Sequence, residues 1–161
     1  AFKLSKSVLL CERSGMDRYI LSHFNYSPLN IQLKQLSYHD LFETATGMLL
    51  MAYAPRDVQE EVYHHYRKCG YLFFPELESF SDLMEQFEQI KRERIFIRDK
   101  YRTLQWIVAV PVCKNGIVVA ALGLSAPAAD AEPEERTRMI AELKKTADLI
   151  SNELSTIETT G

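Results

Sequence analysis

The sequence predicts an α+β domain in which helices flank a mainly antiparallel central sheet of about six strands. Three observations lead to this fold class. Apolar runs with strand-like patterning open the chain, amphipathic helical segments occupy its middle, and a strand-turn-strand segment precedes a last long helical segment. The chain has 161 residues, of which 47% are hydrophobic, so we expect one domain, residues 1–161, with its own core.

The first third of the chain is expected to be extended. Residues 3–12 and 19–24 form two runs around a Ser14-Gly15 turn, and Ile31-Gln32-Leu33 continues the pattern as a third strand. A short strand, residues 95–97, is expected later, where helical periodicity gives way to three apolar residues that favour strands.

Four helices are expected, and residues with known capping preferences mark most of their ends. The first starts at Thr44 and stops before Pro55, which suits the first turn of the second helix. The second stops at Gly70, and the third follows Ser79 or Ser81. The fourth, near the C-terminal end of the sequence, is long and amphipathic.

Residues 104–127 are predicted to form a β-hairpin, because Asn115-Gly116 supplies the two positive φ angles of a type I′ turn. A two-residue turn fixes one register. On one face, that register places these residues opposite each other: Lys114 and Ile117, Val112 and Val119, Val110 and Ala121, Val108 and Gly123, Trp106 and Ser125.

This face of the hairpin becomes hollow along its second strand, where its side chains shrink to Ala121, Gly123 and Ser125. Two interpretations remain open. The hollow forms one wall of a ligand pocket, or Trp106 lies across Gly123 and fills it, since glycine in a strand often marks close packing by a neighbour.

A second feature is the predicted helix start at Thr44-Ala45-Thr46-Gly47. Backbone N–H groups without acceptors and the positive end of the helix dipole favour an anion at such a position. The dipole contributes only about 0.3 to 1 kcal/mol when exposed and up to about 2 kcal/mol when partly buried, so it orients a carboxylate without capturing one unaided. The alternative is an ordinary capped helix whose Gly47 packs on the sheet.

Composition excludes several classes of function. A net charge of -3 argues against a nucleic-acid platform, because such surfaces need clustered Lys and Arg. No apolar run approaches the roughly 20 residues of a membrane span, and no secretory signal opens the chain, so we expect a cytoplasmic protein without a membrane partner. Three cysteines at wide spacing suit reduced thiols. Because the chain opens on Ala1, it is read as a fragment of something longer.

Neither catalysis nor metal binding is expected. His65 and Cys69 share one helical face next to His64, but two ligands are too few for a metal site. No Ser/His/Asp or Cys/His set with a known local signature can be assembled, and no glycine-rich phosphate loop is present among six glycines. We therefore predict no catalytic residue, no metal and no cofactor.

The order of the segments resembles that of a known family over nearly the whole chain. The resemblance rests on four segments: 44–52 (TATGMLLMA), 68–71 (KCGY) at the end of the Pro-led helix, 107–112 (IVAVPV) and 120–127 (AALGLSAP). The chain is similar to the effector-binding domain of IclR-type (isocitrate lyase regulator) transcription factors.

The resemblance implies a GAF/PAS-like fold whose pocket binds a small-molecule effector, often a carboxylate or an aromatic metabolite. It also implies a winged helix-turn-helix DNA-binding domain at the N-terminal side, which is absent from this chain. The effector-binding residues that it implies are Ala45, Thr46, Gly47, Leu104, Trp106, Gly123 and Ser125. The hairpin register independently places Trp106, Gly123 and Ser125 together.

The chain departs from the family pattern at one of these residues, Trp106, and at two residues just before the helix start. Phe42 stands where the family often has His, and Glu43 brings a negative charge close to the presumed anion site. Trp106 stands where a small residue such as Cys is common, so the indole either stacks on a ligand or fills its place.

The function predicted from the resemblance is small-molecule sensing and oligomerisation, as a homodimer or homotetramer, in a bacterial IclR-type transcription regulator. Such a domain couples effector binding to the operator affinity of an upstream DNA-binding domain, and it contacts DNA only through that domain. The alternative is a GAF/PAS-like signalling or interaction module of another regulatory protein with a filled, ligand-free interior.

Overall fold

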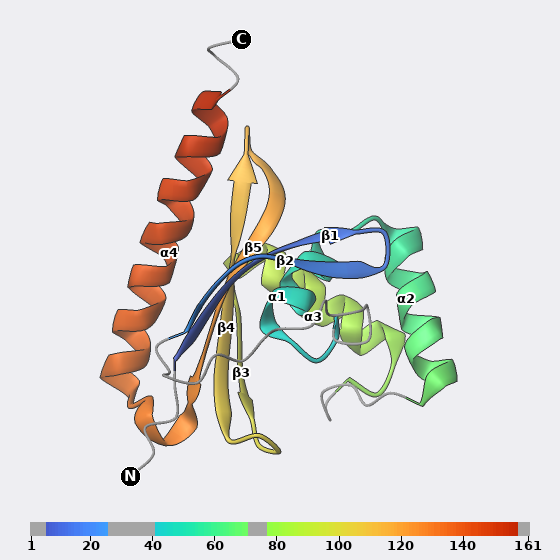
Figure 1. Ribbon diagram of the computed structural model, residues 1–161. Coiled ribbons are helices and arrows are strands. Elements are labelled where there is room, and N and C mark those ends of the chain that lie inside the picture. Colours follow the sequence, from blue (N-terminus) through green and yellow to red (C-terminus); the bar gives the residue numbers. More distant parts are fainter. Residues whose placement is uncertain (1–5, 26–40, 71–76, 158–161) are drawn as a thin grey trace.

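The computed structural model describes residues 6–25, 41–70 and 77–157. Within them, five strands form one antiparallel sheet in the order β2-β1-β5-β4-β3 (Figure 1). The strands are β1 (Ser7–Ser14), β2 (Asp17–Asn25), β3 (Phe96–Lys100), β4 (Gln105–Lys114) and β5 (Ile117–Pro127). The helices are α1 (Ala45–Ala52), α2 (Arg56–Cys69), α3 (Phe80–Glu93) and α4 (Pro133–Thr156), with the short 3₁₀ helix η2 (Ala128–Asp130) before α4.

The predicted fold class is confirmed: helices flank a central antiparallel sheet. Five of the roughly six expected strands lie in the described part of the chain. The expected strand Ile31-Gln32-Leu33 falls outside the described residues. Among the described helices, none combines the length and hydropathy that a membrane-spanning segment requires.

The helix ends follow the capping residues that the sequence offers. Thr44 Oγ1 accepts a hydrogen bond from the Gly47 N–H at 3.1 Å and so caps α1. Ser79 and Asp82 form a reciprocal capping box at the start of α3, and these bonds lower the pKa of the Asp82 carboxyl. Gly70 ends α2 with φ of 70°. The predicted starts at Thr44 and Ser79 and the stop at Gly70 are therefore confirmed.

One face of the sheet packs against α1 and α3, with α2 beyond them (Figure 1). The core on this side is apolar and closely packed. Its buried residues include Cys11, Ile107, Ala109 and Ala121 from the sheet and Met48, Leu49, Val62, Leu83 and Phe87 from the helices.

The other face packs against α4, which runs along β4 and β5 (Figure 1). Arg136 of α4 donates to both carboxylate oxygens of Asp99 on β3, at 2.9 and 3.1 Å. Its guanidinium also lies 5.3 Å from the centre of the Trp106 ring. One side chain thus fastens α4 to two adjacent strands.

The hairpin turn is confirmed, but the predicted register was wrong. Asn115 and Gly116 have φ of 50° and 80°, and Lys114 lies opposite Ile117. A β-bulge then leaves Val119 as an extra residue on β5, so that Val112 lies opposite Ala120. Every pair beyond the bulge is shifted by one residue, and the side chains of β4 are on the opposite face from the one expected.

Gly47 lets α1 approach the segment that precedes it. A Cβ atom added at Gly47 would lie 2.2 Å from the carbonyl oxygen of Leu41 and 2.6 Å from its Cα. Both atoms belong to the backbone, so no side-chain rotation relieves the overlap. The predicted alternative, an ordinary capped helix, placed Gly47 against the sheet. The nearest atoms to a Cβ at Gly47 belong instead to Leu41, in the segment just before the helix.

We expect Gly47→Ala to lower the free energy of unfolding by about 2 kcal/mol, because overlap in a packed interior outweighs the better helix propensity of alanine. Urea denaturation measures the loss. Gly15→Ala is the control, since nothing lies within 4 Å of the added atom and only its φ of 59° is strained, at a cost of about 1 kcal/mol. Equal losses in the two variants would contradict the packing argument.

Candidate functional site

The candidate site lies where the first turn of α1 meets the sheet. A Cβ added at Gly123 of β5 would lie 2.5 Å from Thr46 Cγ2, so the Thr46 methyl group occupies the space in front of the glycine. The hollow predicted from the sequence is therefore present at Gly123, and the Thr46 side chain fills it. Two of the predicted residues, Thr46 and Gly123, are brought together as expected.

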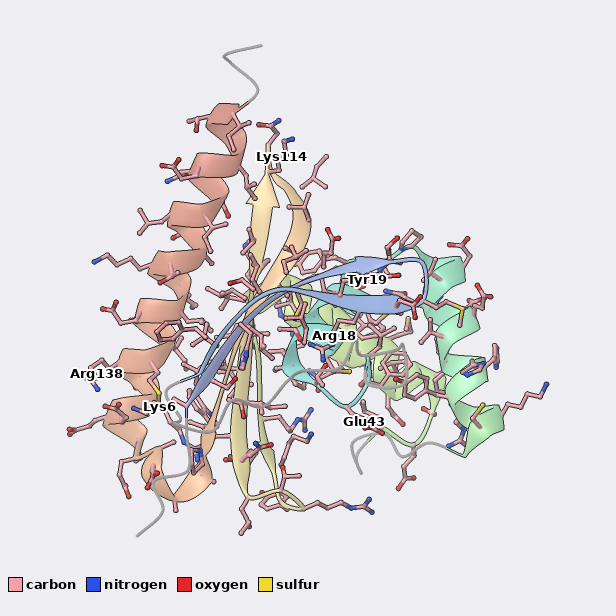
Figure 2. All side chains as sticks on the ribbon, in the orientation of Figure 1. Lys6, Arg18, Tyr19, Glu43, Lys114 and Arg138 are labelled. Carbon is pink, nitrogen blue, oxygen red and sulfur yellow. The ribbon has the colours of Figure 1, made fainter. Side chains whose placement is uncertain are left out.

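Arg18 of β2 is the main residue of this site that the sequence prediction missed. Its side chain is 1% exposed and lies in the interior between β2 and α1 (Figure 2). Arg18 Nη1 donates to Thr46 Oγ1 at 2.8 Å and to Cys11 Sγ at 3.1 Å. Because a guanidinium stays protonated in proteins, the site holds a permanent buried positive charge.

The register of β1 and β2 explains how Arg18 reaches this position. Cys11 lies opposite Ile20, and Arg18 is two residues before Ile20, so all three point to the face that packs on α1. Alternation in the sequence did not reveal this, because Tyr19 and Leu21 on the other face of β2 are also hydrophobic. The signal that was present is an arginine inside a strand-like run.

The first turn of α1 contributes backbone donors. Gly47 N–H is used by the Thr44 cap, and Met48 N–H donates to Thr44 O at 3.0 Å. The N–H groups of Ala45 and Thr46 have no acceptor within the helix, as at every helix start. The buried Arg18 and the positive end of α1 therefore place two sources of positive potential close to the Thr46 hydroxyl.

Two predicted residues lie elsewhere. Trp106 is fully buried on the α4 face with Leu124 and Ala126, opposite the face of Gly123, because the bulge reverses its side. It neither covers Gly123 nor faces Thr46. Leu104 is 72% exposed in the turn between β3 and β4, with φ of 50°. Ser125 does share the face of Gly123, but its cross-strand neighbour is Ile107.

The departure at Phe42 has a packing explanation. Phe42 is fully buried, and its ring stands edge-on to Tyr66 of α2 at 4.8 Å between centroids. Phe87 of α3 lies 6.3 Å away. Phe42 therefore joins the helices to one another just before α1 begins.

Metal ligands are not gathered at this site. Among residues 6–25, 41–70 and 77–157, no group of three or more His, Cys, Asp or Glu side chains is arranged to hold a metal ion. His65 Nε2 and Cys69 Sγ are 3.5 Å apart at the exposed end of α2, away from Arg18.

Comparison with known proteins identifies the fold. A transcriptional regulator from Rhodococcus sp. RHA1 is similar over 94% of this chain and 62% of its own, with a TM-score of 0.74 and 20% identity. The C-terminal domain of the E. coli transcriptional regulator KdgR matches over 93% of this chain and 88% of its own, with a TM-score of 0.69 and 19% identity. The chain has the fold of an IclR-type C-terminal domain. The resemblance noted in the sequence is thereby confirmed for the fold.

A third similar structure contains a ligand. It is an IclR homologue from Microbacterium hydrocarbonoxydans in complex with 4-hydroxybenzoate, with a TM-score of 0.68 and 19% identity, covering 93% of this chain and 61% of its own. The first two similar structures are of transcriptional regulators, and the third is of an IclR homologue. The chain spans 62%, 58% and 56% of the lengths of three of the regulators that it matches. No protein-family model matches the sequence, and no curated protein does.

Close packing of Thr46 on Gly123 makes a measurable prediction. Gly123→Ala is expected to lower the free energy of unfolding by about 1 to 3 kcal/mol, because the added methyl group overlaps Thr46 Cγ2. Thr46→Ser removes Cγ2 but keeps the hydroxyl that accepts from Arg18. In the Thr46→Ser background, the same Gly123→Ala change should cost less than about 1 kcal/mol. Additive losses in a urea-denaturation cycle would refute this contact.

Proposed function

We propose that this chain is the effector-binding domain of an IclR-type transcriptional regulator and that its effector is a small carboxylate. The effector favours one arrangement of an oligomer of the chain and so changes the operator affinity of an attached DNA-binding domain. A tenfold change in affinity requires only about 1.4 kcal/mol of coupling.

The buried Arg18 beside the first turn of α1 is the observation that carries the proposal. Guanidinium groups bind carboxylates through two parallel hydrogen bonds, and charge-assisted bonds of this kind are the strong ones in proteins. The Thr46 hydroxyl accepts from Arg18, so its own proton remains to be donated to a ligand oxygen. The Ala45 and Thr46 N–H groups, which have no acceptor within the helix, supply two more donors at the start of α1.

Fold similarity supports the same class of ligand. The similar regulator from Microbacterium hydrocarbonoxydans binds 4-hydroxybenzoate, which carries a carboxylate on a flat ring. Of the effector residues implied by the resemblance, this proposal keeps those in the first turn of α1 and those on the sheet face toward α1. They are Ala45, Thr46 and Gly47 on the helix and Gly123 and Ser125 on β5, with Arg18 of β2 added. Trp106 and Leu104 are left out because one faces α4 and the other is exposed in a turn.

A second candidate function is an interaction module without a ligand. The observation in its favour is that the Thr46 methyl group already fills the hollow at Gly123. Glu43, half-buried in the turn before α1, also supplies a carboxylate from the chain itself. Under this hypothesis Arg18 serves only to join β2 to α1.

Ligand titration separates the two functions. We expect 4-hydroxybenzoate or a related small carboxylate to bind the purified chain, as measured by calorimetry and by a rise in melting temperature. The corresponding neutral amide should bind at least about tenfold more weakly, because it loses the charge-assisted bonds to Arg18. If no member of a panel of aromatic and aliphatic carboxylates shifts either signal, the interaction module is favoured.

Arg18→Met tests the anchoring residue directly. It should weaken carboxylate binding by at least about tenfold while leaving the weak binding of the amide unchanged. Arg13→Met is the matched control, because Arg13 lies directly opposite Arg18 on β1 and donates instead to the Gly15 carbonyl. Arg18→Lys keeps the charge without the paired bonds and should bind with intermediate affinity. Wild-type affinity in a folded Arg18→Met variant would exclude Arg18 as the anchor.

A further inference from the structure

The sheet face toward α1 becomes polar next to Gly123. On one side of this glycine, at Cys11, the face is buried in the core. On the other side it carries Ser7 of β1, His23 of β2 and Ser125 of β5, which we call the polar strip. Two members of the strip, Ser7 and His23, are not among the residues that the family resemblance implies.

The strand register places the polar strip on the same face as the candidate site. Ser7 lies opposite Ser125, and Leu9 lies opposite both Gly123 and His23. Residues opposite each other in paired strands, and residues two apart on one strand, point to the same face. Because Gly123 faces the first turn of α1, the three side chains of the strip face the same side.

The polar strip is held in shape by a side-chain hydrogen bond and remains open to a ligand. His23 Nε2 and Ser7 Oγ are 3.0 Å apart, so the ring and the hydroxyl form a pair across β1 and β2. Ser7, His23 and Ser125 are each partly exposed. The strip is therefore an inward-facing polar surface that the helices do not cover completely.

An apolar residue separates the polar strip from the proposed carboxylate anchor. Leu9 lies beside Gly123 and is partly exposed, with its inner part packed on the core around α1. Thr46 marks the level of Gly123, and Ser125 follows two residues later, about 7 Å along a strand. This spacing is comparable to the distance between a carboxylate and a hydroxyl at opposite ends of a six-membered ring.

We propose that the effector carries a hydroxyl group at the end away from its carboxylate, and that the polar strip binds this hydroxyl. The inference rests on the proposed function, since it takes the carboxylate to be bound at Arg18 and Thr46. The apolar middle of the effector then lies over Leu9. In this arrangement the His23–Ser7 pair determines specificity, while Arg18 supplies the charge-assisted bonds.

The chemistry of the polar strip favours a hydroxyl over a second carboxylate. Serine hydroxyls and a neutral imidazole both donate and accept hydrogen bonds, as a hydroxyl does, whereas a carboxylate only accepts. Arg98, a cation on the same face, lies beyond Ile107 on β3 and donates to Gln86 of α3 at 2.7 Å. The strip thus presents groups that match a neutral partner.

Binding to the polar strip also discriminates between effectors. An analogue without the hydroxyl would remove the strip from water without replacing the hydrogen bonds that water makes there. Sites built to bind a hydroxyl therefore reject analogues that lack it. The expected result is a large difference in affinity between two carboxylates that differ only in one distant hydroxyl group.

Calorimetry with the purified chain compares 4-hydroxybenzoate, 2-hydroxybenzoate and benzoate. We expect 4-hydroxybenzoate to bind at least about tenfold more tightly than benzoate. The 2-hydroxy isomer should gain nothing over benzoate, because its hydroxyl stays beside the carboxylate. Equal affinities for 4-hydroxybenzoate and benzoate would overturn the inference but not the proposed function. If none of the three binds, the inference falls, and the wider carboxylate panel decides whether the proposed function falls with it.

Variants test the polar strip through the ratio of the 4-hydroxybenzoate and benzoate affinities, which a purely structural role would not change. Ser7→Ala and His23→Leu should each lower this ratio to about threefold or less. His23→Gln keeps a donor and an acceptor and should restore part of it. Ser22→Ala is the matched control, because Ser22 precedes His23 but lies opposite Leu10, on the other face. A wild-type ratio in folded Ser7→Ala and His23→Leu variants would refute the role of the pair.

Discussion

The close approach of the first turn of α1 to the sheet is the constraint on which the candidate site depends. Two glycines make it possible: a Cβ at Gly47 would overlap the Leu41 carbonyl, and a Cβ at Gly123 would overlap Thr46. Because both side chains are absent, the helix start lies directly against β5. Thr46 is thereby brought within hydrogen-bonding distance of Arg18 on a strand at the edge of the described sheet.

Arg18 introduces an electrostatic cost that the fold must offset. A buried guanidinium cannot lose its proton, so it has to be hydrogen-bonded, and Thr46 and Cys11 provide two of its acceptors. The positive end of α1 lies on the same side and does not favour a cation there. Negative charge is therefore favoured at this place, which is the physical basis of the proposal that the effector is a carboxylate. It also explains why Glu43 is tolerated beside the helix start.

The β4–β5 hairpin shows how a single inserted residue changes the faces of a sheet. The Asn115-Gly116 turn is formed as its chemistry requires, but the extra Val119 shifts every later pair. Trp106 consequently packs beneath α4 and its Arg136, and Ile107 takes the place opposite Ser125. Both faces of this sheet are covered and apolar. The sequence of β4 therefore has no polar–apolar alternation from which the one-residue shift could be recognised.

The sequence by itself determined the fold class, the helix ends at Thr44, Ser79 and Gly70, and the hairpin turn, because each depends on backbone preferences within a few neighbouring residues. It also marked a hollow at Gly123, without deciding between a ligand and a packed neighbour. Only the tertiary structure decided that this neighbour is Thr46 and that Arg18 joins it. Those contacts join segments far apart in the chain. The β4–β5 bulge, which decided the face of Trp106, likewise has no local signature.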